Sequence, residues 1–257
     1  MSGTIVLTLS YDGSGFAGFA RQPGLETVQG RVESALETVL RRPVETTGAG
    51  RTDAGVHALG QVMSFSACGD EPAPSALMRS LNALTGDGIV VTGARCASRG
   101  FNARHSAIAR EYRYHLVPGP VPPLFSASHA WWVKATLDVG AMREAASHLV
   151  GEHDFRTFCV TASAEGRRTV RRIERIEITP EVVFGEHALV VRVVGNAFLH
   201  SMVRVIVGSL VEVGRRRRSP EWMAEALTAR DRAAAGPTAP AHGLVLWHVT
   251  YPDECWL

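Results

Sequence analysis

The order of the expected elements constrains the fold more than any other feature of this sequence, because one order runs through the first half and is repeated in the second. In residues 27–40, Val28, Val32, Leu36, Val39 and Leu40 recur at the spacing of one helical face. Shorter segments of strand character lie on both sides of that helix. The first half is therefore expected to run strand, helix, strand, strand, helix and strand, over residues 4–9, 27–40, 44–47, 61–65, 75–84 and 89–91.

The second half contains one ambiguous segment, residues 201–213. This stretch is apolar and rich in β-branched residues, so periodicity alone does not choose between strand and helix. Its length and the glycine that ends it, Gly214, favour a buried helix. The other expected elements are a strand at 112–116, a helix at 137–150, a hairpin of 171–178 and 188–194, a short helix at 220–229 and a strand at 243–249.

Two β-α-β-β-α-β halves with antiparallel strands predict an α+β protein in which helices stack on a sheet. We divide the chain into an N-terminal half, residues 1–104, and a C-terminal half, residues 105–257. No low-complexity linker separates the halves, and the proline-rich residues 118–123 are the expected connector or surface loop. We do not expect the halves to behave as independent domains.

The composition describes an ordinary globular protein, with 46% hydrophobic and 20% charged residues in a chain of 257. The N-terminus has no basic region followed by an apolar run, and Arg204 and Glu212 interrupt the longest apolar stretch. We therefore expect neither a signal peptide nor a membrane span. The four cysteines are far apart and lack paired metal spacing, so reduced thiols, no metal site and a cytoplasmic location are the expectation.

The octapeptide Gly50-Arg51-Thr52-Asp53-Ala54-Gly55-Val56-His57 is the strongest candidate for a functional site. It places one carboxylate, Asp53, on a tight turn beside an arginine, and its glycines permit positive φ and close approach of a ligand. Expected strands on both sides would hold this loop as scaffolds hold catalytic residues. An ordinary turn, in which the aspartate bonds only the following amides, has a similar sequence. The motif alone does not decide between these interpretations.

Several further segments favour the functional interpretation of this loop, because they match one known family in that family's order. They are Tyr11-Asp12-Gly13-Ser14 with Gly18 and Gln22, residues 48–62, Phe101-Asn102-Ala103-Arg104, Ala109-Arg110-Glu111-Tyr112-Arg113-Tyr114, Gly151-Glu152-His153-Asp154-Phe155, residues 196–204, Gly208-Ser209-Leu210, and Gly243-Leu244 to Tyr251-Pro252. Together they resemble the tRNA pseudouridine synthase family called TruA over nearly the whole chain. Two departures are small: Phe19 stands where the family usually has tryptophan, and residues 84–87 lack the usual proline.

The resemblance implies an isomerase that converts uridine to pseudouridine at positions 38 to 40 of the tRNA anticodon stem-loop. It also implies one continuous, mostly antiparallel central sheet with a basic cleft across it. In the reaction the C1′–N1 bond breaks, the uracil rotates, and C5 bonds to C1′. No cofactor or phosphate donor is needed, but an ionised carboxylate must act on a nucleotide extruded from its stack. The resemblance implies that Asp53 is this carboxylate, by either a covalent ester or a glycal route.

Arg204 is the candidate partner for Asp53. A carboxylate in a dry pocket stays ionised when a cation offsets the desolvation that would raise its pKa. Arg204 interrupts an otherwise apolar helix, so it is either paired inside the protein or directed to a helix edge. The family's pattern implies the pair with the aspartate.

Tyr112 and Arg51 are the candidate substrate-binding residues. Tyr112 is either an ordinary strand aromatic or, as the resemblance implies, the ring that stacks on the flipped uracil and serves in proton transfer at C5. Arg51 is expected to help extrude the base or hold a phosphate, unless it is a solvated loop arginine. His57 and His200 are either RNA contacts or structural histidines.

The partners follow from the same resemblance: tRNA, and a second copy of this chain in a homodimer. The net charge of +2 is only weakly basic, but 26 of the 27 basic residues are arginine. GC-rich codon usage explains such an excess as well as phosphate recognition does. The clusters are Arg41-Arg42, the arginines of residues 167–175 and residues 215–218, of which the last is also suited to a helix end.

Two other functions fit parts of the pattern. A catalytically silent RNA-binding protein on the same scaffold is one, although Asp53, Tyr112 and Arg204 are all present. A carboxylate-dependent hydrolase such as a nucleosidase is the other, and it lacks a second well-placed acid in the Asp53 motif.

Overall fold

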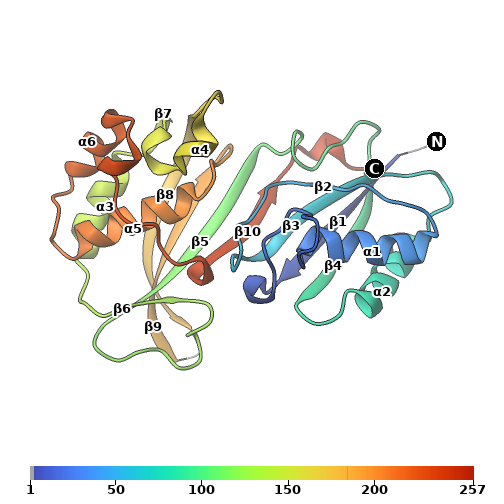
Figure 1. Ribbon diagram of the computed structural model, residues 1–257, viewed down its shortest axis with the longest axis horizontal. Coiled ribbons are helices and arrows are strands. Elements are labelled where there is room, and N and C mark those ends of the chain that lie inside the picture. The colour runs from blue at the N-terminus through green and yellow to red at the C-terminus, as the bar shows by residue number, and fades with distance from the viewer. Residues whose placement is uncertain (1–2, 184) are drawn as a thin grey trace. The chain divides into compact units, whose positions relative to one another are not determined.

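The computed structural model describes residues 3–183 and 185–257 (Figure 1). Its chain contacts group into two compact units. The first comprises Met1–Arg110 together with Leu246–Leu257, and the second comprises Glu111–Val245. The division between residues 104 and 105 rests on the repeated order of elements and stays a prediction. We describe each unit by itself.

The first unit is built on three long antiparallel strands. Strand β1 (Thr4–Tyr11) lies between β4 (Ile89–Ala97) and β3 (His57–Ser66), and the two-residue β2 (Thr47–Gly48) pairs with β3. Most of β10 (Leu244–Thr250) belongs to this unit and lies on the other side of β3. The sheet thus borders the loop between β2 and β3, which contains Asp53.

Two helices of this unit lie at the expected positions and pack against each other. Helix α1 (Val28–Leu40) begins at Thr27, whose side chain accepts a hydrogen bond from the Gly30 N–H, and its predicted face buries Val28, Val32 and Leu36. Helix α2 (Pro74–Leu84) contacts both α1 and β4. Both helices were predicted to within about two residues at each end, the usual limit of boundary definitions.

The strand predicted at residues 44–47 is wrong except for Thr47. The backbone groups of Thr46 are taken by side chains of α1 instead of by a neighbouring strand. Glu33 Oε1 accepts from the Thr46 N–H at 3.0 Å, and Gln29 Nε2 donates to the Thr46 carbonyl at 3.0 Å. A backbone whose donor and acceptor are already satisfied has no reason to extend a ladder.

The second unit has its own run of strands. The hairpin of β8 (Val170–Val183) and β9 (Glu186–Gly195) is antiparallel, as predicted; β7 (Gly151–Asp154) pairs with β8, and β5 (Ala109–Pro118) neighbours β9. The three-residue β6 (Trp131–Val133) runs parallel to the end of β5. The sequence did not predict β6 and β7, which are too short to show a period.

Helices of this unit are α3 (Val139–Ser147), α4 (Thr161–Ala164), α5 (Met202–Gly214) and α6 (Trp222–Ala229). The ambiguous segment is indeed a buried helix, α5, in which every residue except Arg204 and Glu212 is buried. Residues 236–240 cross it so closely that a Cβ on Gly208 would lie 1.8 Å from the Pro237 carbonyl oxygen. We call these five residues the strap.

The α+β class and the mostly antiparallel sheet with helices packed on it are therefore confirmed, whereas the basic cleft stays a prediction. Residues 118–123 leave the end of β5 as a surface loop inside the second unit. In the described part of the chain, every helix is too short or too polar to cross a membrane.

Candidate active site

Asp53 lies in the loop between β2 and β3, and its side chain is half-buried. The Val56 N–H donates to the Asp53 carbonyl at 3.1 Å, which closes a tight turn. Gly55 within this turn has a φ of +78°, a conformation that favours glycine, as the sequence predicted. Arg51, two residues before Asp53, is exposed on the same loop. The structure thus places two of the four predicted site residues together.

Three hydrogen bonds to backbone carbonyls fix the backbone before Asp53. Arg110 donates to the Ala49 carbonyl at 3.0 Å, Gln61 Nε2 to the Gly50 carbonyl at 2.9 Å, and the Phe19 N–H to the Thr52 carbonyl at 3.1 Å. Arg110 also binds the carbonyls of Arg104 and Ala107, so one guanidinium joins three backbone carbonyls from two segments of the chain. The loop carrying Asp53 is a rigid frame, as catalytic constellations require.

The segment after β1 packs beneath this loop by means of two glycines. A Cβ on Gly13 would lie 2.1 Å from the Val56 carbonyl oxygen. Gly18 has a φ of +107°, and a Cβ there would lie 3.2 Å from the Thr52 carbonyl oxygen. Larger residues would push the two segments apart, which explains why both glycines accompany the Asp53 motif.

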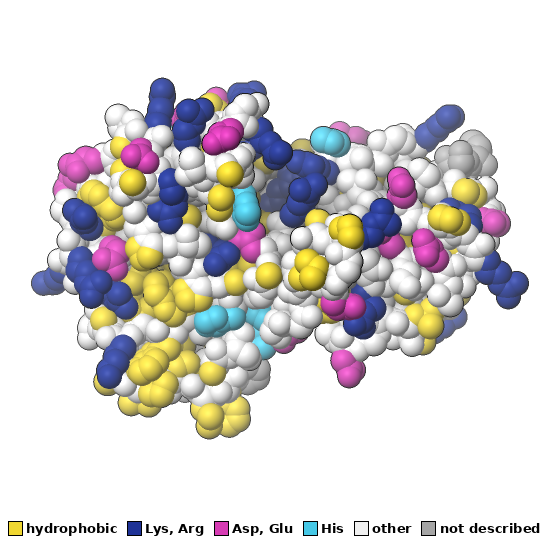
Figure 2. All heavy atoms as spheres, viewed as in Figure 1, with side chains coloured by type: hydrophobic (Ala, Val, Ile, Leu, Met, Phe, Trp, Pro, Cys, Tyr) yellow, Lys and Arg dark blue, Asp and Glu magenta, His cyan; other side chains and the backbone are white. Residues whose placement is uncertain are grey.

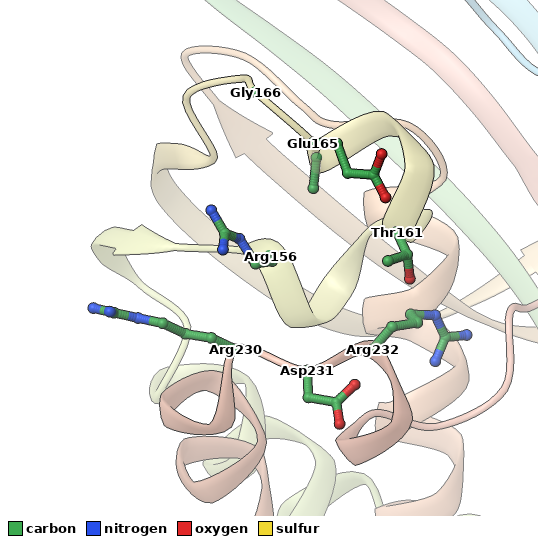
Figure 3. A pocket seen from close by; sticks show the side chains of 8 residues that line it. Arg156, Thr161, Glu165, Gly166, Arg230, Asp231 and Arg232 are labelled. Atoms are coloured by element: carbon green, nitrogen blue, oxygen red, sulfur yellow. The ribbon is translucent and has the colours of Figure 1, made fainter.

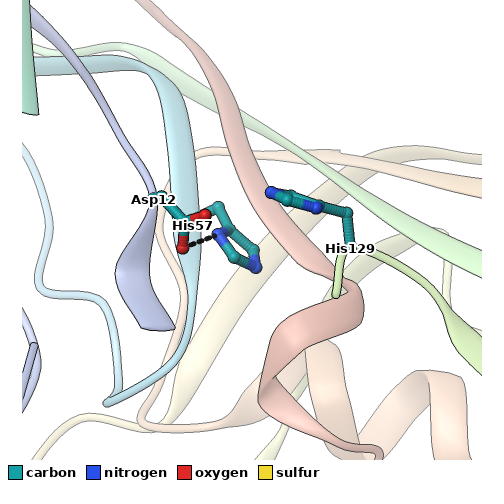
Figure 4. A group of neighbouring side chains, drawn as sticks. All are labelled: Asp12, His57 and His129. Carbon is teal, nitrogen blue, oxygen red and sulfur yellow. Dashed lines mark ion pairs between the residues drawn. The ribbon is translucent and has the colours of Figure 1, made fainter. Parts of the chain in front are cut away.

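His57, at the end of the loop, is buried at 3% exposure, in favour of a structural role. Its Nδ1 lies 3.1 Å from the Gly13 N–H and 3.2 Å from Asp12 Oδ1 (Figure 4). One ring nitrogen serves only one of these contacts at a time: it accepts from Gly13 when it has no proton and donates to Asp12 when it has one. Both contacts hold the same turn, residues 12–15, against the loop.

Phe19 fills a packing site, as the sequence predicted for this departure from the family. Its ring stacks on Tyr11 with centroids 6.4 Å apart, and it occupies the space that a side chain on Gly48 would need. Phe19 in place of tryptophan therefore concerns the packing beneath the loop. The position of Asp53 depends on the hydrogen bonds to the loop backbone.

Tyr112 lies on β5 in the second unit and is only 7% exposed. The rings of Tyr112 and Phe198 pack edge to face, with centroids 5.1 Å apart and planes at 84°. Phe198 is itself half-buried in the segment that leads into α5. The predicted substrate aromatic is therefore held by a second aromatic ring.

Arg204 lies on the first turn of α5 and is half-buried. Its Nε donates to the Ala239 carbonyl at 2.8 Å, while the Ala239 N–H donates to the Arg204 carbonyl at 3.1 Å. The next carbonyl of the strap, that of Pro240, accepts from the Tyr114 hydroxyl at 2.7 Å. Burial raises the pKa of Tyr114 above its usual value, and the charge of Arg204 offsets part of that rise.

These contacts bring Arg204 to the β5 face that carries Tyr112, since Tyr112 and Tyr114 point to the same side of their strand. The four predicted residues thus form two groups, Asp53 with Arg51 in the first unit and Tyr112 with Arg204 in the second. The Asp53–Arg204 ion pair stays a prediction.

The sequence did not reveal three supporting residues: Tyr11, Gln61 and Arg110. Each belongs to a segment that the resemblance includes, but the partners of their hydrogen bonds lie 11 to 61 positions away in the chain. One signal was available for Gln61, an uncharged polar residue at the start of an apolar strand, where a buried amide needs partners.

The arginine clusters differ in how their charge is balanced. Arg215 and Arg217 lie 3.5 and 3.3 Å from Glu212, and Arg216 lies 3.1 Å from Asp138. This run follows the end of α5, in agreement with the helix-end interpretation. In contrast, the exposed arginines Arg167, Arg168, Arg172 and Arg175 make no ion pair within the described residues.

A hollow of about 260 Å³ lies in the second unit beside this second cluster (Figure 3). Arg156, Arg230 and Arg232 line it together with Glu165 and Asp231. Arg232 donates to the Gly236 carbonyl and to Thr238, so its role is to hold the strap. With two carboxylates among its lining residues, the hollow is close to charge balance.

Comparison with known proteins gives one consistent result. A family model described as tRNA pseudouridine synthase matches residues 8–95 and 145–252. The tRNA pseudouridine synthase A of Shouchella clausii is 43% identical over 244 residues, which cover 95% of this chain and 91% of that protein. The proteins of the same name from Bacillus subtilis and Frankia casuarinae are 43% and 45% identical over 251 residues each, covering 96% of this chain and 98% and 89% of theirs.

Proposed function

We propose that this chain, which belongs to the tRNA pseudouridine synthase family and isomerises uridine to pseudouridine in tRNA, uses Asp53 as its catalytic carboxylate. The observation that carries the proposal is the loop itself. A half-buried carboxylate projects from a turn whose neighbouring carbonyls are fixed by Arg110, Gln61 and Phe19. Such rigidity keeps a reacting group in place without a further ordering cost.

In the proposed reaction, Asp53 has one main task. The C1′–N1 bond of the extruded uridine breaks while Asp53 either attacks C1′ or removes a proton from the sugar. The uracil then rotates and C5 bonds to C1′, while the ester to Asp53 breaks or Asp53 returns the proton to the sugar. Finally C5 loses its proton and N1 gains one. No atom is gained or lost overall, so the residues need only supply charge, orientation and proton transfer.

The other predicted residues have distinct roles in this proposal. Arg204 supplies the cation that favours the ionised form of the carboxylate. Tyr112 offers an aromatic face to the extruded uracil and a hydroxyl for proton transfer at C5. Arg51, exposed two residues before Asp53, binds a phosphate or takes the place of the extruded base. The substrate uridines are those at positions 38 to 40 of the anticodon stem-loop, and the reaction takes place in the cytoplasm, where this tRNA is found.

The test uses tRNA tritiated at C5 of its uridines. The wild-type protein should release tritium without free uracil, and Asp53→Asn and Asp53→Ala should release none while still binding tRNA. Binding should persist because phosphate contacts supply most of the affinity. Asp70→Asn, which changes an exposed aspartate of the same unit, is the matched control and should keep full activity.

Each other outcome has a definite meaning. Substantial tritium release by Asp53→Ala at saturating tRNA would remove Asp53 from the mechanism. Free uracil from the wild-type protein would indicate a hydrolase. Mapping of pseudouridine outside positions 38 to 40 would leave the activity intact but correct its target.

We also propose that the protein acts as a homodimer, and a loop of the second unit supports this. Val121, Leu124 and Phe125 are 73%, 77% and 70% exposed, and no Asp, Glu, Lys or Arg lies between residues 114 and 133. Figure 2 shows apolar side chains gathered at the lower left, over this loop and the β8–β9 hairpin. Exposed apolar patches of this kind mark interaction sites, and a two-fold interface would bring this patch against the same patch of a second copy.

A further inference from the structure

A chain of buried polar side chains runs beneath the Asp53 loop. Gln61 Nε2 lies 3.3 Å from the Tyr11 hydroxyl oxygen and 2.9 Å from the Gly50 carbonyl oxygen. The Tyr11 hydroxyl lies 2.8 Å from Thr52 Oγ1. All three side chains are buried, with Gln61 at 0% exposure. Thr52 immediately precedes Asp53.

The direction of the hydrogen bonds that Gln61 makes follows from their chemistry. The Gly50 carbonyl only accepts, so the amide nitrogen of Gln61 must face the loop, and its second N–H points to the Tyr11 oxygen. Gln61 Oε1 accepts from the Val62 N–H at 3.2 Å, which fixes the amide from its other side. Either hydroxyl can be the donor in the bond between Tyr11 and Thr52. Burial raises the pKa of Tyr11 to about 12, so the Tyr11 hydroxyl keeps its proton at neutral pH.

We infer that Tyr11 and Gln61 are positioning residues for Asp53, fixing the loop at Gly50 and Thr52 so that the carboxylate leaves the backbone in one direction. This inference rests on the proposed catalytic role of Asp53. The loop needs such support because it contains two glycines and because none of the residues 49–56 belongs to a strand, although the Ala49 N–H donates to the Val62 carbonyl of β3. A displacement of about 1 Å at a reacting group costs on the order of 100-fold in rate.

The chain can be broken without breaking the sheet. Tyr11 pairs with Ala58, and Leu9 pairs with Gln61, through backbone atoms that side-chain substitutions leave in place. Phe19 and Arg110 also continue to hold the loop through Thr52 and Ala49. A variant of Tyr11 should therefore fold and lose only the accuracy with which Asp53 is placed.

Tyr11→Phe is the primary test, and Tyr251→Phe is its matched control. Tyr251 belongs to the same unit and is similarly buried, with 7% exposure against 5% for Tyr11. Its buried hydroxyl also makes a hydrogen bond, to the Ala103 carbonyl at 2.6 Å. Both variants should lose similar thermal stability. Only Tyr11→Phe should lower the single-turnover rate constant at saturating tRNA, by about 10-fold or more. The tRNA dissociation constant should be unchanged in both.

Thr52 provides the conservative comparison. Thr52→Ser keeps the hydroxyl and should keep the single-turnover rate, whereas Thr52→Val removes the hydroxyl and should behave like Tyr11→Phe. The double variant Tyr11→Phe/Gln61→Leu should be no slower than the slower single variant, because both break one chain.

Equal rate constants for Tyr11→Phe and Tyr251→Phe would overturn the inference and leave Tyr11 as a core residue only. A higher dissociation constant for tRNA with an unchanged rate constant would overturn it as well. Neither result changes the proposed function, which is tested separately by the activity of the Asp53 variants and by the absence of free uracil.

Discussion

Arg204 is the residue whose two possible tasks are easiest to separate. Its Nε holds the strap through Ala239, and we propose that its charge supports Asp53. Arg204→Ala should lower the single-turnover rate by orders of magnitude and cost on the order of 1 kcal/mol of folding stability, the usual contribution of a hydrogen bond. Arg204→Lys should restore only part of the rate, because the planar fork of donors is lost. Tritium release and thermal denaturation measure the two effects.

Tyr114→Phe separates the strap from the charge. It removes the neighbouring hydrogen bond to the Pro240 carbonyl and leaves the guanidinium in place. We expect a loss of stability similar to that of Arg204→Ala, with a far smaller loss of rate. A near-normal rate for Arg204→Ala would mean that the strap is its only task.

At this scale the sequence predicted the glycine turn and the packing of Phe19, and the pairing of Arg204 with Asp53 stays a prediction. The sequence did not reveal the contacts of Gln61 with Gly50 or of Arg110 with Ala49. Glycine turns and helical spacing are local patterns, whereas these hydrogen bonds join residues 11 and 61 positions apart whose meeting depends on the register of strands. Only the folded sheet defines that register.

Among the elements, the loop after β5 shows how one side chain orders a segment. The Glu186 carboxylate accepts from the Leu124, Phe125 and Ser126 N–H groups and from the Ser126 hydroxyl. These hydrogen bonds lower the pKa of Glu186 from 4.5 to about 2, and the bond from the Ser126 hydroxyl contributes most. The loop is therefore expected to present Leu124 and Phe125 in one conformation.

Because the folded-state pKa of Glu186 is depressed, its contribution is present above about pH 4.5 and is lost as the pH falls towards 2. Glu186→Gln should remove it at neutral pH. We expect faster amide hydrogen exchange at residues 124–126 in this variant at pH 7, and in the wild-type protein only in the acid range. Glu174→Gln, an exposed position on β8, is the control and should exchange like the wild type. Slow exchange at residues 124–126 in Glu186→Gln would show that other contacts order the loop.

Elements with a clear period were predicted well, and those defined by side-chain contacts were not. Helices α1 and α2 and the β8–β9 hairpin lie where the spacing of their apolar residues placed them. The expected strand before Thr47 is missing because Glu33 and Gln29 occupy the backbone of Thr46. Strands β6 and β7 were missed because three or four residues carry no measurable alternation.

For the whole molecule, the sequence predicted the fold class, and its division of the chain at residue 104 stays a prediction. The final residues, Leu246–Leu257, group with the first unit, where Tyr251 donates to the Ala103 carbonyl and its ring meets Phe101 at 5.0 Å. An order of elements read along the chain does not show that its end returns to its beginning, because that return depends on which strand edge is left open.

The oligomeric state is the prediction that belongs to this scale. If the apolar loop is the contact between two copies, Leu124→Asp/Phe125→Asp should convert a dimer into a monomer of 27.7 kDa in sedimentation experiments. A charge placed in each copy would face its own image across a two-fold interface, and both would lose water. Val90→Asp, which adds a charge at an exposed valine of β4, should leave the dimer intact.

Function should change with the oligomeric state, because the anticodon stem-loop is only one arm of an L-shaped tRNA. A second copy would add arginine surface for the rest of the tRNA. The candidates are Arg167, Arg168, Arg172 and Arg175, because they make no ion pair in the part of the chain that the structure describes. The monomeric variant should therefore bind full-length tRNA more weakly, yet modify an isolated anticodon stem-loop as fast as the wild type does. A wild-type protein that sediments as a stable monomer and modifies full-length tRNA at full rate would refute the dimer. A dimer that survives both aspartates would place the interface elsewhere.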